Sequence, residues 1–275
     1  MRSATGRRRA IDGPERSTAR SGAECGWFRR PEWAVLVVQA AWLIGCSAAL
    51  PPAEATPTGR FEWSQERFDK RKYPAAIRGF RDFLFREPLH PLADSARYLL
   101  GEAYLRSGQE LLAANEFSQL AVSRPNSPLA DDAQFGTCRA HWELSPKLPL
   151  DQEKTRQAID ECTRLLEFFP RSPHTSEARR IRREARAKMA AKQLRNARWY
   201  YKRELYESAI IYLELIVSQY PEAPNLPDVL ALLYDSYTRV GFRSEAETVR
   251  ARLLREFPDS EQARKLAGPE RAERS

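Results

Sequence analysis

Few side chains in this 275-residue sequence have the type and spacing that chemistry requires. The sequence contains three histidines and four cysteines, with no CxxC pair and no HExxH, GxSxG, GxGxxG or GxxxxGK[ST] motif. Zinc ribbons, metal hydrolases, serine hydrolases and nucleotide-binding folds depend on those patterns. The histidines are His90, His141 and His174, which are far apart in the sequence. We therefore predict no metal site, no cofactor and no enzymatic activity.

Two pairs of adjacent acidic residues could provide general acid and base groups. They are Asp131-Asp132 and Asp160-Glu161. The first pair lies at the expected start of a helix and the second on an expected exposed helix face. The repeat pattern described below places no histidine or lysine beside either pair. We expect these carboxylates to be solvated or to complement helix dipoles.

Cys46 has the sequence context of a cysteine that becomes acylated. It follows Leu43-Ile44-Gly45, and Arg29-Arg30 precede a run of twelve residues, 33–44, in which Gln39 is the only polar one. This run is too short to cross about 30 Å of hydrocarbon, and basic residues before a short apolar core are typical of a signal peptide. The whole order resembles the lipobox of bacterial lipoproteins, which implies a thioether-linked diacylglycerol on Cys46. The alternatives are a cysteine that ends such a segment by chance and a membrane-buried thiol.

The first sixty residues accordingly divide into three segments. Residues 1–28 are rich in Arg, Gly, Ser and Ala without apolar periodicity, so we expect a disordered or misassigned extension. Residues 29–45 form the predicted lipoprotein signal peptide, and residues 46–60 form a Pro-rich, non-helical tether. Residues 1–45 hold eight Arg and four acidic residues, so they contribute half of the formal net charge of +8. The modest charge of the remainder argues against a nucleic-acid partner.

Beyond residue 61, prolines end amphipathic segments at regular intervals, and apolar residues recur at helical rather than strand spacing. The five prolines are Pro88, Pro125, Pro170, Pro221 and Pro258. Twelve residues before them stand Ala76, Ala113, Ala158, Ala209 and Ala246, and five residues before them stand Phe83, Leu120, Leu165, Ile216 and Leu253. A small residue lets two crossing helices approach closely, so the pattern predicts five helical hairpins.

These offsets resemble the tetratricopeptide repeat, stretched by about three residues. The resemblance implies an all-α solenoid of about five helix pairs. Longer intervals between prolines predict a loop at 145–152 and one long helix over 175–205, which contains neither Gly nor Pro. The apolar stripe of this helix is expected at Ala190, Leu194, Ala197, Tyr201 and Leu205. Its eleven basic and three acidic residues predict either a solvated face or a surface for an acidic partner.

Two further residue groups leave alternatives open. Cys138 and Cys162 fall on repeat offsets that are small or apolar elsewhere, so we predict core thiols, with a disulfide as the alternative if their geometry allows it. Two of the three residues Trp199-Tyr200-Tyr201 are expected to pack between helices. The alternative for this group is a groove that stacks on substrate aromatic side chains.

The combination of lipobox, Pro-rich tether, five stretched repeats, third-repeat insertion and long linking helix resembles the BamD family of outer-membrane β-barrel assembly lipoproteins. The resemblance extends from residue 46 to about 267 and is strongest at 158–172 and 199–209. It implies a lipid-anchored subunit on the periplasmic face of the outer membrane, with repeats 1–3 at 61–180, a linking helix and repeats 4–5 at 181–268, and a disordered tail at 269–275. It also implies docking of the carboxy-terminal repeats onto the barrel subunit BamA. The amino-terminal repeats would form a groove for unfolded outer-membrane proteins or an accessory lipoprotein.

Candidate contact residues follow from this resemblance. Tyr73 and Tyr104 are the candidates for the substrate groove. The candidates for partner binding are Arg239, Arg243, Arg250 and Arg252. Arg250 occupies an offset that is apolar or Cys in the other four repeats, which indicates that another protein or water takes over this face; the alternative is a polar solubilising cap. The rival function is another periplasmic repeat lipoprotein, an envelope or cell-division scaffold of the Tol-Pal-associated type, for which an amino-terminal coiled coil would be expected.

Overall fold

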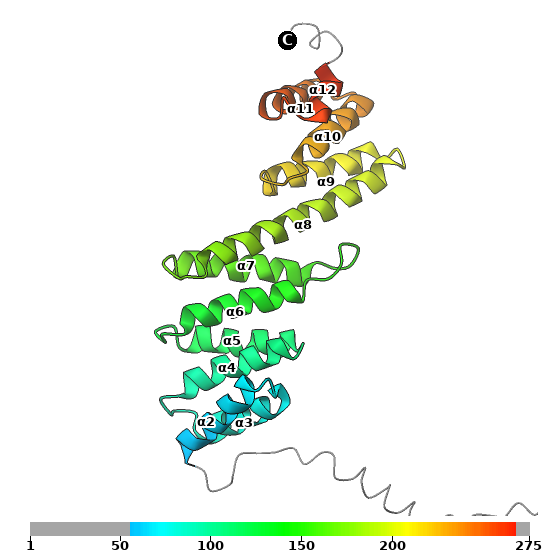
Figure 1. Ribbon diagram of the computed structural model, residues 1–275. Helices are drawn as coiled ribbons and strands as arrows, with labels where there is room; N and C mark the ends of the chain where they lie inside the picture. Colours follow the sequence, from blue (N-terminus) through cyan, green and yellow to red (C-terminus); the bar gives the residue numbers. More distant parts are fainter. Residues whose placement is uncertain (1–55, 268–275) are drawn as a thin grey trace, which may run out of the picture. The chain divides into compact units, whose positions relative to one another are not determined.

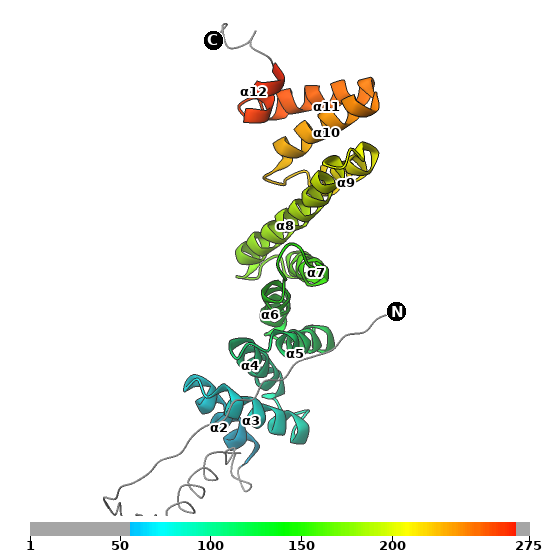
Figure 2. The ribbon, with the colours of Figure 1, turned by 90° about the vertical axis from the view of Figure 1, so that its right-hand side faces the viewer.

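The computed structural model describes residues 56–267, and every regular element in that part of the chain is an α-helix. The helices are α2 (Pro57–Asp69), α3 (Tyr73–Arg86), α4 (Ala93–Arg106), α5 (Glu110–Ser123), α6 (Ala130–Glu143), α7 (Glu153–Phe168), α8 (Thr175–Tyr201), α9 (Tyr206–Gln219), α10 (Leu226–Val240), α11 (Arg243–Glu256) and α12 (Glu261–Ala267). Each helix contacts the next along the chain, so α2 to α11 form five pairs and α12 follows them (Figure 1). Figure 2, turned by 90°, shows the same succession in chain order. The predicted all-α class and the number of pairs are confirmed.

The second helix of every pair ends just before a repeat proline, as the repeat pattern predicts. α3, α5, α7, α9 and α11 each end two residues before one of the five prolines. The residue between helix and proline has a φ between −127° and −135° and a ψ between 52° and 61° in all five cases. Proline disfavours the helical conformation of the residue before it, which explains why the helix stops there.

The repeated small and apolar residues form the interior of the array. The five alanines are at most 3% exposed, and the apolar residues five positions before the prolines are at most 1% exposed. Alanine leaves room for the partner helix, and the large side chain seven residues later, two helical turns along the same face, fills the space between helices. The predicted core positions are therefore confirmed.

A left-handed residue closes the turn inside four of the five pairs. These residues are Arg71, Gly108, Glu204 and Gly241, with φ between 57° and 90°, and each lies five residues before the repeated alanine. Only glycine adopts this conformation without a steric penalty from Cβ. The third pair instead has the predicted loop at 145–152 between α6 and α7.

Two boundaries differ from the sequence prediction. The long helix ends at Tyr201 rather than Leu205, because Glu204 takes the left-handed turn position, and Leu205 is 49% exposed rather than part of the apolar stripe. The first helix begins at Pro57, inside the segment predicted as a non-helical tether. Thr56 caps it by accepting a hydrogen bond from the Gly59 N–H at 3.1 Å, and proline is well suited to the first helical position.

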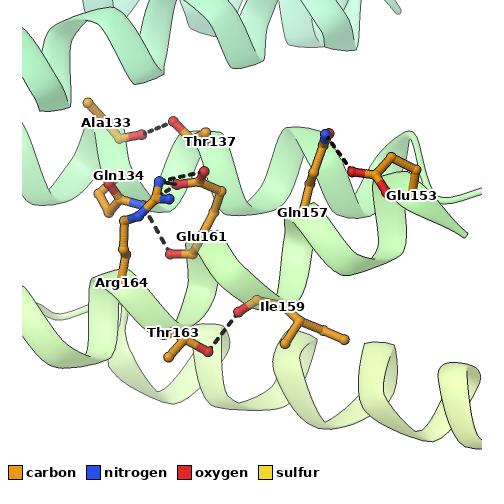
Figure 3. Close-up of polar contacts among 9 residues, drawn as sticks. All are labelled: Ala133, Gln134, Thr137, Glu153, Gln157, Ile159, Glu161, Thr163 and Arg164. Atoms are coloured by element: carbon orange, nitrogen blue, oxygen red, sulfur yellow. Dashed lines mark hydrogen bonds and ion pairs between the residues drawn. The ribbon is translucent and has the colours of Figure 1, made fainter.

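The third pair is held together by both covalent and polar contacts. Cys138 of α6 and Cys162 of α7 are joined by a disulfide with a Cα–Cα distance of 5.0 Å. The structure therefore contains the disulfide that was the alternative prediction, and not two free thiols. Close by, the Gln134 side chain donates to the backbone oxygen of Glu161 at 3.0 Å and to its carboxylate at 2.9 Å (Figure 3). Arg164 binds the same carboxylate at 2.7 Å. The sequence predicted a solvated carboxylate at Glu161. In the structure this carboxylate instead bridges Gln134 of α6 and Arg164 of α7.

The interior divides into three hydrophobic clusters that follow the chain. The first is formed by α2 to α6, the second by α8 from Met189 onward together with α9 to α12, and the third by α6, α7 and the start of α8. Ala178 and Ile181 belong to the third cluster, whereas Leu194 and Ala197 belong to the second. α8 therefore contributes side chains to the cores on both sides of it.

Candidate docking surface on the long helix and the last pairs

α8 presents a strongly basic surface. Its 27 residues include nine Lys and Arg and two Glu. Arg180 is neutralised within the helix by Glu177 and Glu184, with N–O distances of 2.5 Å and 2.7 Å. Lys188 donates to Ser145 Oγ at 2.6 Å and Lys192 to the Pro149 oxygen at 2.9 Å, so both lysines hold the 145–152 loop against the helix. The remaining basic side chains are grouped around two hollows.

The first of these, the basic hollow, has a volume of about 580 Å³ and lies between α7, the first half of α8 and the α9–α10 turn. It is lined by Arg179, Arg182, Arg183, Arg186, Glu222, Ile159 and Thr163. Arg186 forms an ion pair with Glu222, which lowers the pKa of that carboxyl, and its guanidinium stacks over the Tyr220 ring at 5.2 Å. Within residues 56–267, no carboxylate forms an ion pair with the other three arginines. The hollow therefore carries an excess of positive charge that suits carboxylate groups.

The second, the aromatic hollow, has a volume of about 570 Å³ and lies beside the second half of α8. Leu148, Ala191 and Leu194 supply apolar lining. Arg195, Lys202 and Arg203 supply positive charge, whereas Arg198 forms an ion pair with Asp228, which also lines the hollow, at 3.3 Å. Trp199 is 50% exposed here, with the Arg203 guanidinium 3.7 Å from its ring centre. An exposed indole flanked by cations is suited to an amphipathic acidic partner.

The other two aromatic residues of this segment pack between helices, as predicted. Tyr200 stacks on Tyr212 of α9, with ring centres 5.3 Å apart. Tyr201 meets Tyr206 edge-on at 5.3 Å and donates a hydrogen bond to Asp235 of α10. The two tyrosines thus pack α8 against α9 within the fourth pair, and Tyr201 also links α8 to α10.

The four arginines predicted to bind a partner have different surroundings. Arg239 is exposed but donates to Asp235 at 2.9 Å and to the Tyr206 hydroxyl at 3.1 Å, contacts that raise its pKa. Arg252 donates to Glu256 within α11 at 2.9 Å. Exposed Arg243 begins α11, and no ion pair involving it occurs among residues 56–267.

Arg250 contacts α12 instead of standing free at the end of the array. Its guanidinium donates to the Leu266 oxygen at 3.4 Å and to Glu247 at 3.3 Å. A cation near the last carbonyls of a helix is favourable, so α12 gives a local reason for an arginine at an offset that is apolar or Cys elsewhere.

The two tyrosines predicted for a substrate groove also differ. Tyr104 is 6% exposed and belongs to the first hydrophobic cluster, where burial raises its pKa. Its ring is therefore part of the core and not of a surface groove. Tyr73 is half-buried and packs edge-on against Phe68 at 5.8 Å.

The candidate acid–base residues form a structural contact. His174 Nε2 lies 2.6 Å from Asp132 Oδ1, and its ring stacks on Phe135 at 4.5 Å. The expectation that this acid pair lacks a histidine partner was therefore wrong, because the α7–α8 turn brings His174 back to the start of α6. The contact ties the third pair to α8. No cluster of three or more metal-ligating side chains occurs within residues 56–267.

None of the helices in residues 56–267 combines the length and the apolar character that a membrane span requires. Cys46 and the predicted signal peptide lie outside the described residues.

Comparison with known proteins identifies the family to which the chain belongs. The family model described as "YfiO: Outer membrane lipoprotein" matches residues 53–253. The chain is similar to the "Outer membrane protein assembly factor BamD" of Caulobacter vibrioides, 23% identical over 196 residues that cover 70% of this chain and 63% of the relative. The protein of the same name from Xylella fastidiosa is 25% identical over 109 residues, which cover 40% of this chain and 37% of the relative. The one from Neisseria meningitidis is 22% identical over 210 residues, which cover 72% of this chain and 78% of the relative.

The chain thus spans less than two thirds of the length of the Caulobacter and Xylella proteins that it matches. The family model nevertheless covers nine of the eleven described helices completely, as well as the first part of α11. The resemblance predicted from the repeats is confirmed, and the chain belongs to the YfiO family of outer membrane lipoproteins.

Proposed function

We propose that this protein is a lipid-anchored scaffold subunit of the machinery that assembles β-barrel proteins in the outer membrane. The observation that carries the proposal is the family match over residues 53–253, supported by three relatives named as outer membrane protein assembly factors. The array of helix pairs fits a role in binding proteins, because stacked pairs present contacts from several repeats at once. Catalysis is not part of the proposed role.

Cys46 is the proposed site of attachment on the periplasmic face of the outer membrane. Each buried methylene of an acyl chain contributes about 0.8 kcal/mol, so two or three chains hold a protein firmly whereas one does not. Cys46→Ser should leave an uncleaved or soluble product, which envelope fractionation and the intact mass of the protein would reveal. A variant that still fractionates as a normally processed outer-membrane protein would exclude Cys46 as the anchor.

The proposed contact with the barrel subunit lies on α8 and the last two pairs. The basic hollow supports this assignment, because Arg179, Arg182 and Arg183 offer bidentate donors to carboxylates and α8 bears an excess of positive charge. Exposed Arg243, at the start of α11, is a further candidate contact. Unfolded outer-membrane proteins, or an accessory lipoprotein, would then occupy the amino-terminal pairs, where Tyr73 remains the candidate contact.

Affinity purification from solubilised envelopes tests this assignment. Arg182→Glu combined with Arg183→Glu should strongly reduce recovery of the barrel subunit without changing the thermal midpoint. The control is Lys70→Glu combined with Lys72→Glu, which makes the same change in charge on the exposed α2–α3 turn. If both double variants recover the barrel subunit equally well, the docking surface lies elsewhere.

A further inference from the structure

The turn that follows the first pair carries apolar side chains at two exposed positions, and each of the later repeats has a polar residue at one or both of the equivalent positions. Three residues before and one residue after each of the five prolines, the side chains are exposed in every repeat. In the first repeat these residues are Phe85 and Leu89, which are 87% and 86% exposed. The residues at the same two offsets in the later repeats are Val122 and Asn126, Glu167 and Arg171, Ser218 and Glu222, and Arg255 and Asp259. Only the first repeat is apolar at both offsets.

The geometry of this turn presents its apolar side chains outward. The His90 N–H donates to the Glu87 oxygen at 3.2 Å, so Pro88 and Leu89 form the middle of a tight turn that follows α3. All of Phe85, Pro88 and Leu89 are exposed. We call these three residues the apolar tip.

The charges closest in sequence to the apolar tip are paired. Arg86 donates to Asp82 at 2.8 Å, and Glu87 lies 3.7 Å from Arg60 of α2. An apolar environment is costly for an unpaired charge but much less so for ion pairs. The tip can therefore leave water without exposing an isolated charge.

The apolar tip lies at the end of the first pair where the chain enters. The Arg60–Glu87 contact joins the first turn of α2 to the end of α3, so the start of α2 and the tip share one end of the pair. Figure 1 shows the start of α2 and the α3–α4 connection on the same side. Cys46 is eleven residues before Pro57, and eleven residues can reach at most about 40 Å. An acyl anchor at Cys46 therefore keeps the start of α2 within about 40 Å of the membrane surface.

We propose that the apolar tip inserts into the membrane interface beside the lipid anchor. The occupant of this surface is the lipid bilayer, and the inference rests on the acylation of Cys46 in the proposed function. Because the anchor already confines the tip near the bilayer, insertion needs no further loss of translational freedom. Moving an exposed Phe or Leu side chain out of water shifts a partition equilibrium about tenfold or more, which suffices to favour the inserted state. The anchor and the tip together would set the orientation of the first pair on the membrane.

The test uses the acylated mature protein, from which cleavage before Cys46 has removed Cys25, in vesicles of phosphatidylethanolamine and phosphatidylglycerol. With Cys46 acylated and Cys138 bonded to Cys162, a Leu89→Cys substitution supplies a thiol for an environment-sensitive NBD label. The matched controls carry the label through Asn126→Cys and Asp259→Cys, at the same exposed offset of the second and fifth repeats. We expect blue-shifted emission from the first label and loss of most of it with doxyl-labelled lipids. The control labels should keep water-like, unquenched emission, and Phe85→Ser should reduce the quenching at position 89.

Other results would overturn the inference in distinguishable ways. Water-like emission at position 89 on an acylated chain would show that the tip stays in solvent or awaits a protein partner. Blue-shifted emission without quenching by doxyl lipid would show that another part of the chain covers it. Both results would leave the proposed function intact. A chain whose intact mass lacks the acyl groups would instead overturn the proposed anchoring, and this inference with it.

Discussion

Phe117 of α5 is enclosed by glycines of the two neighbouring helices, and this arrangement makes a sharp prediction. The Phe117 side chain is fully buried. A Cβ atom added to Gly101 of α4 would lie 2.6 Å from Phe117 Cε1, and one added to Gly136 of α6 would lie 2.7 Å from Phe117 Cγ and Cδ2. Ordinary van der Waals contacts begin at about 3.4 Å, so each methyl group would require the ring to move by several tenths of an ångström.

The expected effect is the balance of two terms. Overpacking a filled core costs about 1 to 3 kcal/mol, whereas replacing glycine by alanine within a helix gains about 0.5 to 1 kcal/mol. Gly101→Ala and Gly136→Ala should therefore each lower the free energy of unfolding by about 1 kcal/mol. The ring cannot retreat from one methyl without meeting the other, so the double variant should lose more than the sum of the single variants.

Urea unfolding of the chain from Ser47 onward measures these effects. Asn115→Ala is the matched control, because this exposed residue lies in the same helix as Phe117 and its replacement gains helix propensity without a clash. Phe117→Leu should lower stability alone but cost much less in the Gly101→Ala background. If either glycine variant is stabilised as much as the control, the three helices do not cross as closely as described.

Three further predictions concern the covalent link, a strained turn and a half-buried histidine. Replacing Cys138 and Cys162 together by alanine should lower the free energy of unfolding by about 3 kcal/mol, since the disulfide closes a loop with a sequence separation of 24, and a reducing agent should destabilise the parent but not the variant. Glu204→Gly should raise the free energy of unfolding by about 1 kcal/mol, because glycine adopts a φ of 62° without strain; an unchanged urea midpoint would contradict this. Burial, and secondarily the charge of Lys154, lowers the pKa of His141 in the folded protein. The unfolded chain therefore binds the proton more tightly, and the parent protein should lose stability as the pH falls from 7 through the unfolded pKa of about 6.5. His141→Tyr should remove that part of the pH dependence, and identical slopes for both proteins would refute the assignment.

The helix ends and the core could be predicted because they depend on local rules. Proline stops the helix before it, and alanine marks the closest approach of two helices, so both leave a signal at fixed sequence offsets. Ala158 and Ala209 were placed correctly even though the spacing between their repeats is irregular. The loop at 145–152 was found for the same reason, as surplus length between fixed positions.

Two helix ends could not be predicted because the residues that set them are not the types that usually mark such positions. Arg71 and Glu204 take the left-handed turn position that glycine occupies at Gly108 and Gly241. Because Glu204 is not a glycine, the sequence predicts a long helix that extends four residues beyond its end at Tyr201. Thr56 before a proline is a helix-start signal that the Pro-rich composition obscured.

The candidate surface could be predicted only in outline. The positive charge of α8 follows from its composition. Which of its arginines are paired depends on the folded chain, because Glu222 of the α9–α10 turn forms an ion pair with Arg186. The Asp132–His174 contact and the surroundings of Arg250 depend in the same way on chain segments that meet only after the pairs have stacked.

The long helix has a consequence for how the array unfolds. Repeat proteins with only nearest-neighbour contacts can lose end repeats one at a time, so a boundary between folded and melted parts can sit at any junction. α8 places Ile181 in one core and Leu194 in the next on a single rigid rod, about 40 Å long at 1.5 Å per residue. A boundary inside this rod would break backbone hydrogen bonds and open both cores together. Fraying should therefore be confined to the outer pairs, and the middle of the chain should exchange its amide hydrogens as one cooperative unit.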